Sequence, residues 1–279
     1  MASSARTAAN VIQAAATCSI APLPGAELVA ASRPDERPER ASERAGAVGT
    51  TRVRIRFTTS HPFDANERLF EAMRDCDSVC ESLHLPVQSG SNRILRAMRR
   101  GYTAESYLTK IERLRVLVPD ISLSTDIIVG FPGETDEDFD ATVRLMREVR
   151  YDHAYIFKYS PRPGTDAAAR EDDVPQEVKE ARNQALLALQ EEIYGQRLRA
   201  FEGHQVEILV EEKGKFERQW FGRTRGHHGV IVESPEDLIG HTVQARITRG
   251  TAHTLFGELH ATDLGTRRTN GGGQIRHCR

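Results

Sequence analysis

The spacing of apolar side chains changes between two periods along the chain. Apolar residues at 53, 55 and 57 alternate with arginines, and a period of two is typical of a strand. Further strands are predicted at 83–87, 121–129 and 154–159, and helices at 67–80, 92–99, 103–118 and 135–150. Thr103 has the position of a helix N-cap, and Thr135 with Asp138 has that of a capping box. Alternating strands and helices predict parallel strands with right-handed crossovers, in a barrel or in an open doubly wound sheet.

The pattern changes again after residue 164. A polar linker precedes a long predicted helix at 175–198, with Pro175 near its start, and this helix is expected to bridge two domains. Beyond Gly203, short strands separated by turn residues are predicted at 206–210, 219–224, 230–232, 242–247 and 254–259. Five such strands predict a small barrel resembling an OB-fold. The predicted fold class is therefore α/β, a partial βα barrel of four strands followed by a small all-β barrel.

Both ends of the chain differ from this pattern. Residues 1–50 are rich in Ala, Ser, Pro and Arg and have few large apolar side chains, a composition typical of disorder. Residues 263–279 contain three consecutive glycines and are predicted to be a flexible tail. The expected organisation is a disordered segment at 1–50, a partial barrel with its linker helix at 51–200, and a β-domain at 201–262.

Composition excludes some classes of protein. A charged fraction of 28%, a net charge of −2 and the lack of a long apolar run indicate a soluble globular protein without a membrane span. The near-zero charge requires any RNA contact to come from a local basic patch. The four cysteines, Cys18, Cys76, Cys80 and Cys278, form no disulfide framework and indicate a reducing compartment, so a cytoplasmic location is expected.

Two Gly-rich loops follow predicted strands at 86–92 and 130–134. Parallel βα folds bind ligands at the carboxyl ends of their strands. Glycines allow a backbone to approach a ligand closely, and Gln88, Ser89 and Ser91 can donate hydrogen bonds to a ribose or a carboxylate. From the residues alone, ligand binding and ordinary turn chemistry are equally well supported.

Four segments together carry a specific resemblance. They are RIRFTTSHP at 54–62, LHLPVQSGSN at 83–92, STDIIVGFPGET at 124–135 and FKYSPRPGT at 157–165. In order and spacing they resemble the MiaB-type tRNA methylthiotransferase family. The resemblance extends from about residue 52 to residue 259, and the β-domain resembles the family's RNA-binding TRAM domain.

The resemblance implies a radical S-adenosylmethionine enzyme that methylthiolates N6-isopentenyladenosine beside the anticodon of tRNA. It implies S-adenosylmethionine and [4Fe–4S] clusters as cofactors, tRNA as partner, and a monomer that does not bind membranes. The cofactor-binding residues that we assign on this basis are Gln88, Ser89, Ser91, Asp126, Gly130, Glu134 and Tyr159. The RNA-binding residues are Lys213, Lys215, Arg218, Arg223 and Arg225, with Phe216, Trp220 and Phe221 as candidate stacking surfaces.

The sequence departs from the family at the cluster. Three cysteines in a Cys-x₃-Cys-x₂-Cys motif hold the family's catalytic cluster. Here Cys76 and Cys80 have the first interval, but Leu83 stands in the third place, and both cysteines fall on a predicted helix, one turn apart. No metal ligand is therefore assigned. The expectation is an N-terminally truncated member that lacks the first two barrel strands and is inactive alone.

Three alternatives stay open. The chain is a non-catalytic RNA-binding fragment, or a relative acting on threonylcarbamoyl-adenosine or a ribosomal protein, or a frameshift joins unrelated residues 1–50 to an enzyme fragment. His61 and His84 are candidate ligands or bases, with structural roles favoured. Arg54 and Arg56 point either to an anionic ligand in the open barrel or to solvent. The pair His227 and His228 is interpreted as surface or loop.

Overall fold

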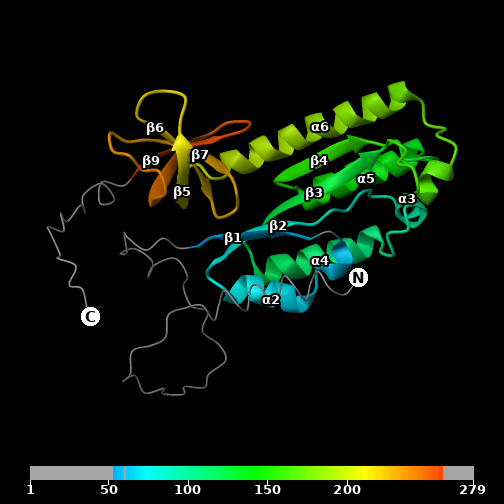
Figure 1. Cartoon of the computed structure of the whole chain (residues 1–279), viewed down its shortest axis with the longest axis horizontal. Coiled ribbons are helices and arrows are strands. Elements are labelled where there is room, and N and C mark those ends of the chain that lie inside the picture. The colour runs from blue at the N-terminus through cyan, green and yellow to red at the C-terminus, as the bar shows by residue number, and fades with distance from the viewer. Residues whose placement is uncertain (1–52, 60, 260–279) are drawn as a thin grey trace, which may run out of the picture.

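The computed structural model describes residues 53–59 and 61–259 as two units (Figure 1). The first unit is a parallel sheet in the order β1–β2–β3–β4. Its strands are β1 (Ile55–Thr58), β2 (Val79–His84), β3 (Ser122–Val129) and β4 (His153–Lys158). The prediction of four parallel strands from a partial βα barrel is confirmed. The segments predicted to be disordered or flexible, 1–50 and 263–279, and with them Cys18 and Cys278, lie outside the described residues.

Helices connect the strands as the pattern predicts. They are α2 (Glu67–Asp75), α3 (Asn92–Ala97), α4 (Ala104–Leu117) and α5 (Asp136–Val149), with short 3₁₀ turns at Pro62–Asp64 and Asp166–Ala169. Both predicted caps are present: the Thr103 side chain accepts from the backbone N–H of Ser106, and Thr135 accepts from that of Asp138. In both cases the third helical residue also bonds back to the cap, which completes a capping box.

The predicted end of one helix is wrong. The helix expected at 67–80 ends at Asp75, and Cys80 lies on β2, where it is 1% exposed. The residues at 77–78 are Asp and Ser, which favour turns over helix interiors. The following residues pair with β1, with Val79 opposite Ile55. Sheet pairing therefore overrides the local helical period, and the two cysteines are not one helical turn apart.

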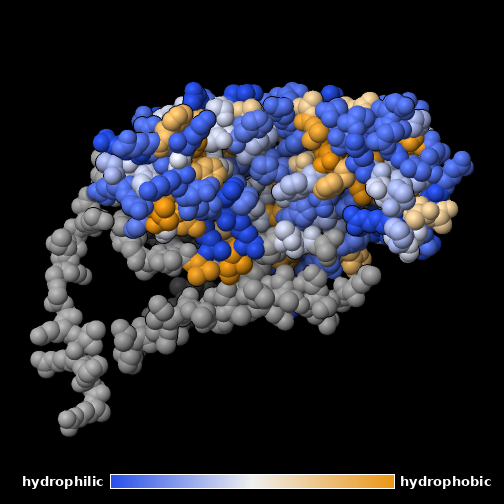
Figure 2. All heavy atoms as spheres, turned by 45° about the horizontal axis from the view of Figure 1, so that its top comes forward, coloured by the Kyte–Doolittle hydropathy of each residue, from blue (hydrophilic) through white to orange (hydrophobic). Residues whose placement is uncertain are grey.

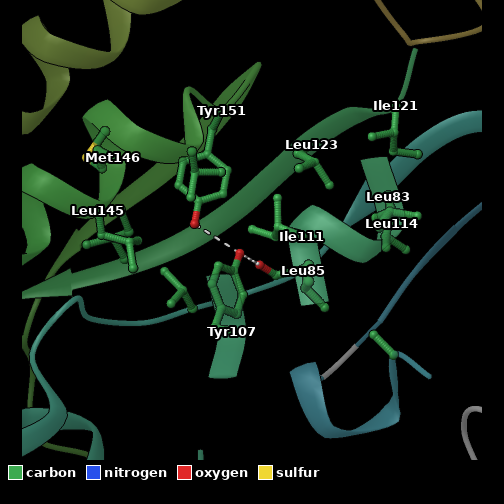
Figure 3. Close-up of a cluster of buried hydrophobic side chains, with 14 of the residues drawn as sticks. Leu83, Leu85, Tyr107, Ile111, Leu114, Ile121, Leu123, Leu145, Met146 and Tyr151 are labelled. Carbon is green, nitrogen blue, oxygen red and sulfur yellow. Dashed lines mark hydrogen bonds between the residues drawn. The ribbon is translucent and has the colours of Figure 1, made fainter. Parts of the chain in front are cut away.

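A single core lies between the helices and one face of the sheet (Figure 3). Alternate residues of β3, among them Leu123 and Ile127, pack against α4 and α5. Two buried tyrosines bridge the layers, because Tyr151 donates to the Tyr107 hydroxyl (3.0 Å) and Tyr107 donates to the Leu85 carbonyl (2.8 Å). Burial raises the pKa of both phenols, so they remain protonated donors.

The other face of the sheet is not covered by these helices. Tyr155 and Phe157 of β4 are 54% and 52% exposed. The side chains on this side alternate with the buried ones along β3 and β4, because successive residues of a strand point to opposite faces. We call the following set the open face: His84, Ser124, Asp126, Ile128, Tyr155 and Phe157.

The helix α6 (Gln176–Arg199) packs along β4 and leads into the second unit (Figure 1). This unit is a closed barrel in the order β5–β6–β7–β9–β8. Its strands are β5 (Gln205–Lys213), β6 (Gln219–Thr224), β7 (Gly229–Glu233), β8 (Thr242–Gly250) and β9 (Leu255–Leu259). The five-stranded barrel predicted from the sequence is confirmed.

The surface in Figure 2 is mainly hydrophilic, and smaller hydrophobic patches interrupt it. No helix within the described part of the chain combines the length and apolar character needed to cross a membrane.

Candidate functional site

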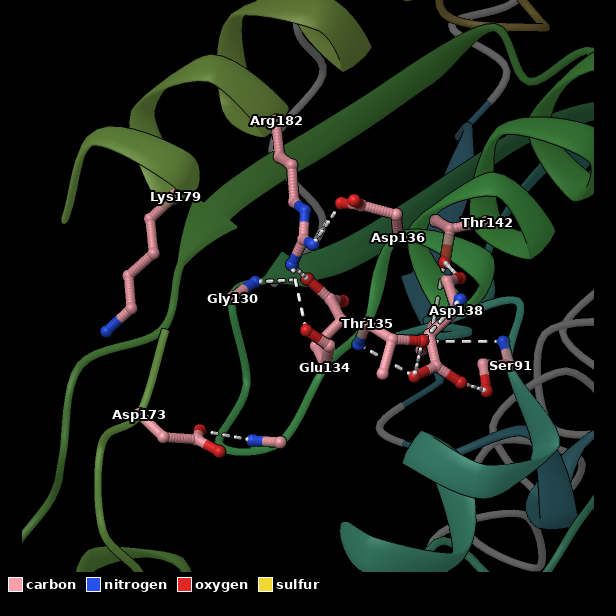
Figure 4. A network of polar contacts seen from close by, with 12 residues as sticks. Ser91, Gly130, Glu134, Thr135, Asp136, Asp138, Thr142, Asp173, Lys179 and Arg182 are labelled. Atoms are coloured by element: carbon pink, nitrogen blue, oxygen red, sulfur yellow. Dashed lines mark hydrogen bonds and ion pairs between the residues drawn. The ribbon is translucent and has the colours of Figure 1, made fainter. Parts of the chain in front are cut away.

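The loop that follows β3 is held by a buried carboxylate (Figure 4). Glu134 is 6% exposed and accepts hydrogen bonds from the Gly130 N–H (2.6 Å) and from Arg182 of α6 (2.8 Å). Burial raises the pKa of Glu134, while the Gly130 N–H and the Arg182 guanidinium oppose that shift. The Glu134 carboxylate therefore closes the loop on itself and anchors α6 to it.

Gly130 is required by close packing in this loop. Its φ is +70°, and a Cβ there would lie 2.3 Å from Cγ of Lys179. The Lys179 stem thus covers the glycine, and its ammonium group bonds to Asp172 (2.6 Å) and lies 5.5 Å from the centroid of the Tyr159 ring. The start of α6 is seated directly on the loop at the carboxyl end of β3.

The second loop is joined to the first through Asp138 of α5 (Figure 4). Asp138 accepts from the hydroxyl of Ser91 (2.5 Å) and forms an ion pair with Arg93. Burial alone would raise the pKa of Asp138, but hydrogen bonds from Arg93 and Ser91 outweigh it and hold the pKa far below its usual value. The Ser91 hydroxyl is also the N-cap of α3, and the Ser89 hydroxyl accepts the Ser91 N–H (3.1 Å).

Two assigned residues at this edge retain unused polar groups. The Tyr159 hydroxyl is buried, and within the described chain it has no hydrogen-bond partner. Its ring meets Phe131 edge-on at 5.2 Å. Asp126 of β3 has a side chain that is 32% exposed on the open face. A buried hydroxyl without a partner is rare in folded proteins, so Tyr159 is the assigned residue that is best placed to receive a ligand.

Gln88 has an unusual backbone conformation and pairs with β3. Its φ is +72°, in the left-handed region that non-glycine residues seldom adopt. The Gln88 N–H donates to the Asp126 carbonyl (2.8 Å), and the Ile128 N–H donates to the Gln88 carbonyl (2.9 Å). These bonds extend the β2–β3 pairing beyond the end of β2, and they bring Gln88 beside Asp126 at the carboxyl edge.

The open face carries one polar cluster. The His84 ring lies between two residues of β3, with Nδ1 3.0 Å from the Ser124 hydroxyl and Nε2 3.4 Å from Asp126. The Tyr155 ring meets the His84 ring edge-on at 6.0 Å. His84 of β2 is thus held by side chains on two further strands, β3 and β4, and its hydrogen-bonding partners belong to the open face itself.

The amino ends of the strands contact the barrel, which the sequence does not predict. Arg54 donates to the Arg223 carbonyl (2.7 Å) and to Glu207 (2.8 Å), and Arg56 donates to the Thr224 carbonyl (2.9 Å). Both expected roles for Arg54 and Arg56, contact with an anionic ligand or with solvent, are therefore wrong. The last two residues of β6, with Glu207 of β5, accept their hydrogen bonds instead.

The turn between β6 and β7 supplies further contacts between the units. Arg225 donates to both oxygens of Glu81 (2.6 and 3.0 Å). Asp152, 1% exposed, accepts from Arg197 (2.6 Å) and from the Leu123 N–H (2.8 Å), and His228 lies 3.6 Å away. The surface position predicted for His228 is wrong, because Tyr194 and Phe201 enclose its ring and leave it 3% exposed.

The assigned RNA-binding residues separate into two groups. Lys213, Lys215 and Arg218 are exposed at the β5–β6 hairpin, where Phe216 is 65% exposed. Arg223 and Arg225 lie at the other end of β6, paired with Glu211 and Glu81. Of the candidate stacking rings, Trp220 is 6% exposed in the barrel core and donates to the Ser234 carbonyl. The hairpin thus combines exposed cations with one exposed ring.

Two features of the site are not predicted by the sequence analysis. The exposed pair of aromatic rings on β4 could have been found from their spacing of two residues. The contact that Asp152 makes between the units could not be predicted from the residues around it, because its partners are distant in sequence.

Within residues 53–59 and 61–259, no group of three or more His, Cys, Asp and Glu side chains is arranged to hold a metal ion.

Two family models match the chain. Residues 24–146 match the radical SAM superfamily, and residues 199–260 match the TRAM domain. Among curated proteins, the chain is 50% identical over 207 residues to the tRNA-2-methylthio-N(6)-dimethylallyladenosine synthase of Carboxydothermus hydrogenoformans, covering 74% of this chain and 47% of that protein. The synthase of the same name from Protochlamydia amoebophila is 48% identical, with 74% and 46% covered. These matches confirm the resemblance found in the motifs.

The chain spans about half the length of the curated relatives it matches. Among solved structures, coproporphyrinogen III oxidase (HemN) from Escherichia coli, described as a radical SAM enzyme, overlaps 52% of this chain and 33% of its own. The TM-score is 0.44 at 20% identity, a likeness too low to define the fold, which is described by the sheet and barrel above.

Proposed function

We propose that this chain is part of a tRNA methylthiotransferase that acts on N6-isopentenyladenosine beside the anticodon by radical S-adenosylmethionine chemistry. The observation that carries the proposal is the identity of 48–50% to synthases of that name over 74% of the chain. The matched stretch is long enough to include both folded units. With tRNA as its substrate, we expect the protein to act in the cytoplasm, as a monomer and away from membranes.

The described residues do not provide a cluster site. A [4Fe–4S] cluster with an open iron needs three thiolates close together. The chain has four cysteines, at 18, 76, 80 and 278, and their spacing contains no Cys-x₃-Cys-x₂-Cys motif. Cys80 is buried on β2 at the domain contact, where burial raises the pKa of its thiol and disfavours the thiolate. We therefore infer that this chain alone does not perform the redox step.

S-adenosylmethionine fits the carboxyl edge of the sheet better. The Tyr159 hydroxyl and the Asp126 carboxylate have unused hydrogen-bonding capacity there. Gln88 and Gly130 bring two backbone segments to the same edge. We propose that these four residues contact S-adenosylmethionine, while Ser89, Ser91 and Glu134 hold the loops in place through the hydrogen bonds described above.

The β5–β6 hairpin is the proposed contact for tRNA. Lys213, Lys215 and Arg218 supply phosphate charges, and Phe216 offers a stacking surface for an unpaired base. Arg223 is a weaker candidate because it is half-buried and paired with Glu211, and Arg225 is engaged by Glu81. The hairpin residues project away from the barrel core, so RNA contact there requires no rearrangement of the fold.

Titration of the full chain with an unmodified tRNA tests the RNA part of the proposal. We expect affinity that falls with salt, and the slope of log K against log salt should decrease in magnitude by about 1.4–1.8 in Lys213→Ala/Lys215→Ala, since each phosphate contact contributes about 0.7–0.9. Glu236→Ala, elsewhere on the barrel, is the matched control. Salt-independent binding or no binding would contradict the proposal.

Anaerobic reconstitution with iron and sulfide tests the redox part. We expect no [4Fe–4S] absorbance and no cleavage of S-adenosylmethionine by this chain alone. Formation of a cluster with turnover would show that this chain is a complete catalyst. If tRNA binds and no cluster forms even when a chain supplying the Cys-x₃-Cys-x₂-Cys segment is added, the non-catalytic RNA-binding fragment becomes the better description.

A further inference from the structure

The open face of the sheet divides into a polar half and an apolar half. In the register of β3 and β4, Asp126 is opposite Tyr155 and Ile128 is opposite Phe157. Residues opposite each other on neighbouring strands lie about 4.8 Å apart and point to the same face. Tyr155 and Asp126, with His84 beside them, thus form one half, and Phe157 and Ile128 form the other, nearer the carboxyl edge.

The aromatic rings on this face are unusually exposed. Tyr155 and Phe157 are two residues apart on β4 and are each about half exposed. By contrast, Ala154 and Ile156, which alternate with them, pack against the main core. Half-exposed aromatic rings side by side on a strand are the arrangement with which RNA-binding sheets stack nucleobases.

The position of the open face fits an RNA ligand. At the amino ends of its strands the face borders the TRAM barrel, where Gly226 of the β6–β7 turn lies against Ser122. At the carboxyl ends it leads to the loop of Gly130 and to Tyr159, the proposed contacts of S-adenosylmethionine. A base held on the open face would therefore lie between the RNA-binding unit and the cofactor edge.

We propose that the open face binds an N6-dimethylallyl adenine within an RNA, with Tyr155 stacking on the purine and Phe157 with Ile128 contacting the dimethylallyl group. The inference rests on the proposed function, from which it takes the class of substrate. The chemical match is between a heteroaromatic ring with a branched five-carbon chain and a surface with one polar aromatic half and one apolar half. Phe157 is then a specificity-determining residue for the modified base.

The test compares two RNAs that differ only in the substituent. A labelled anticodon stem-loop carrying adenosine or N6-dimethylallyladenosine at the same position is titrated against the full chain and followed by fluorescence anisotropy. We expect tighter binding of the modified RNA. Phe157→Ala should weaken binding of the modified RNA about tenfold, as removal of several apolar contacts predicts, and leave the unmodified RNA within about twofold. Tyr155→Ala should weaken both RNAs by similar factors.

Controls separate this inference from structural damage and from the proposed function. Leu187→Ala, at an exposed apolar site on α6 (42% exposed), should change neither affinity, and Phe157→Leu should retain part of the preference. Equal loss for both RNAs in Phe157→Ala, or no loss for either, would overturn the inference while leaving RNA binding intact. If the wild-type chain binds neither RNA, the proposed function fails and the inference fails with it.

A second measurement, with S-adenosylmethionine, tests whether the open face binds the base of the RNA or the adenine of the cofactor. Equilibrium dialysis with S-adenosylmethionine should give the same affinity for wild type and Phe157→Ala. A loss of S-adenosylmethionine affinity in Phe157→Ala, together with an unchanged preference between the two RNAs, would assign the face to the cofactor and overturn the inference.

Discussion

The two ends of the parallel sheet use similar residues for different purposes. At the amino ends, charged side chains are consumed by docking of the TRAM barrel: Arg54, Arg56 and Arg225 contact the partner unit, and Asp152 is a buried junction. At the carboxyl ends, charged side chains such as Glu134 hold the loops in place. Between the two ends, the open face leaves the rings of Tyr155 and Phe157 about half exposed.

The comparison shows what makes a polar residue available to a ligand. In the sequence, an arginine that alternates with apolar residues, such as Arg54, is a candidate contact for an anionic ligand. In the structure, a carbonyl or carboxylate of the other unit accepts its hydrogen bonds instead. Arg225 and Arg218 are both basic residues of the same barrel, but the side chain of the first is largely buried against Glu81 and the second is exposed. Availability is therefore decided by long-range packing.

The largest expected effect is at the buried junction. Asp152→Ala removes the acceptor of Arg197 and of the Leu123 N–H, and it should lower the free energy of unfolding by about 3 kcal/mol because buried charged partners lose their pair. We expect urea unfolding to separate into two transitions as the units uncouple. Asp152→Asn keeps an acceptor and should lose about half as much. One transition with a loss below about 1 kcal/mol would contradict a docking role.

Arg225 and Arg218 allow a comparison between a docking arginine and an RNA-binding arginine of the same barrel. Arg225→Ala leaves Glu81 without its partner and should cost about 2 kcal/mol of stability. Arg218→Ala should change stability by less than about 0.5 kcal/mol and reduce the magnitude of the salt slope of tRNA binding by about 1. Thermal unfolding and a salt titration of binding measure the two quantities. If Arg225→Ala changed only RNA binding, the division between docking and binding arginines would be wrong.

The pH dependence of the domain contact follows from His228. Burial lowers the pKa of His228 from 6.5 to about 4, so the folded protein favours the neutral ring. Its contribution is fully present above pH 6.5 and is lost as the pH falls towards 4, because the unfolded chain takes up the proton first. Between pH 7.5 and 5.0 we expect wild type to lose about 2 kcal/mol more stability than His228→Gln. Equal losses in both proteins, measured by urea unfolding, would exclude this contribution.

The smallest expected changes in stability come from one substitution in the loops and one on the open face. Ser91→Ala removes an N-cap and a hydrogen bond to Asp138, and it should cost about 1 kcal/mol. Asp126→Ala on the open face should change stability by less than about 0.5 kcal/mol. S-adenosylmethionine affinity should show the opposite order, with the larger loss in Asp126→Ala. The reverse order in both measurements would move the ligand contact from Asp126 to the serine loop.

The strands and helices were largely predictable because their signals are local. The caps at Thr103 and Thr135 and the periods of β3 and α5 are encoded within a few residues. The failure at 67–80 occurred where pairing of Val79 with β1 ended the helical period early. The candidate site was predictable as a pair of loops, but the uses of Ser91 and Glu134 depend on Asp138 and Arg182, which are more than 40 residues away.

The sequence by itself determined the order of the elements, the partial barrel followed by five short strands, and the family that the motifs resemble, since these depend on periodicity, turns and short residue patterns. Only the tertiary structure decided which polar groups remain available. Arg54, Arg56 and His228 are hidden because two units meet at the amino ends of the strands. Tyr155 and Phe157 stay exposed because no described helix covers that face. Solvent exposure arises from contacts between distant segments, and no local pattern records it.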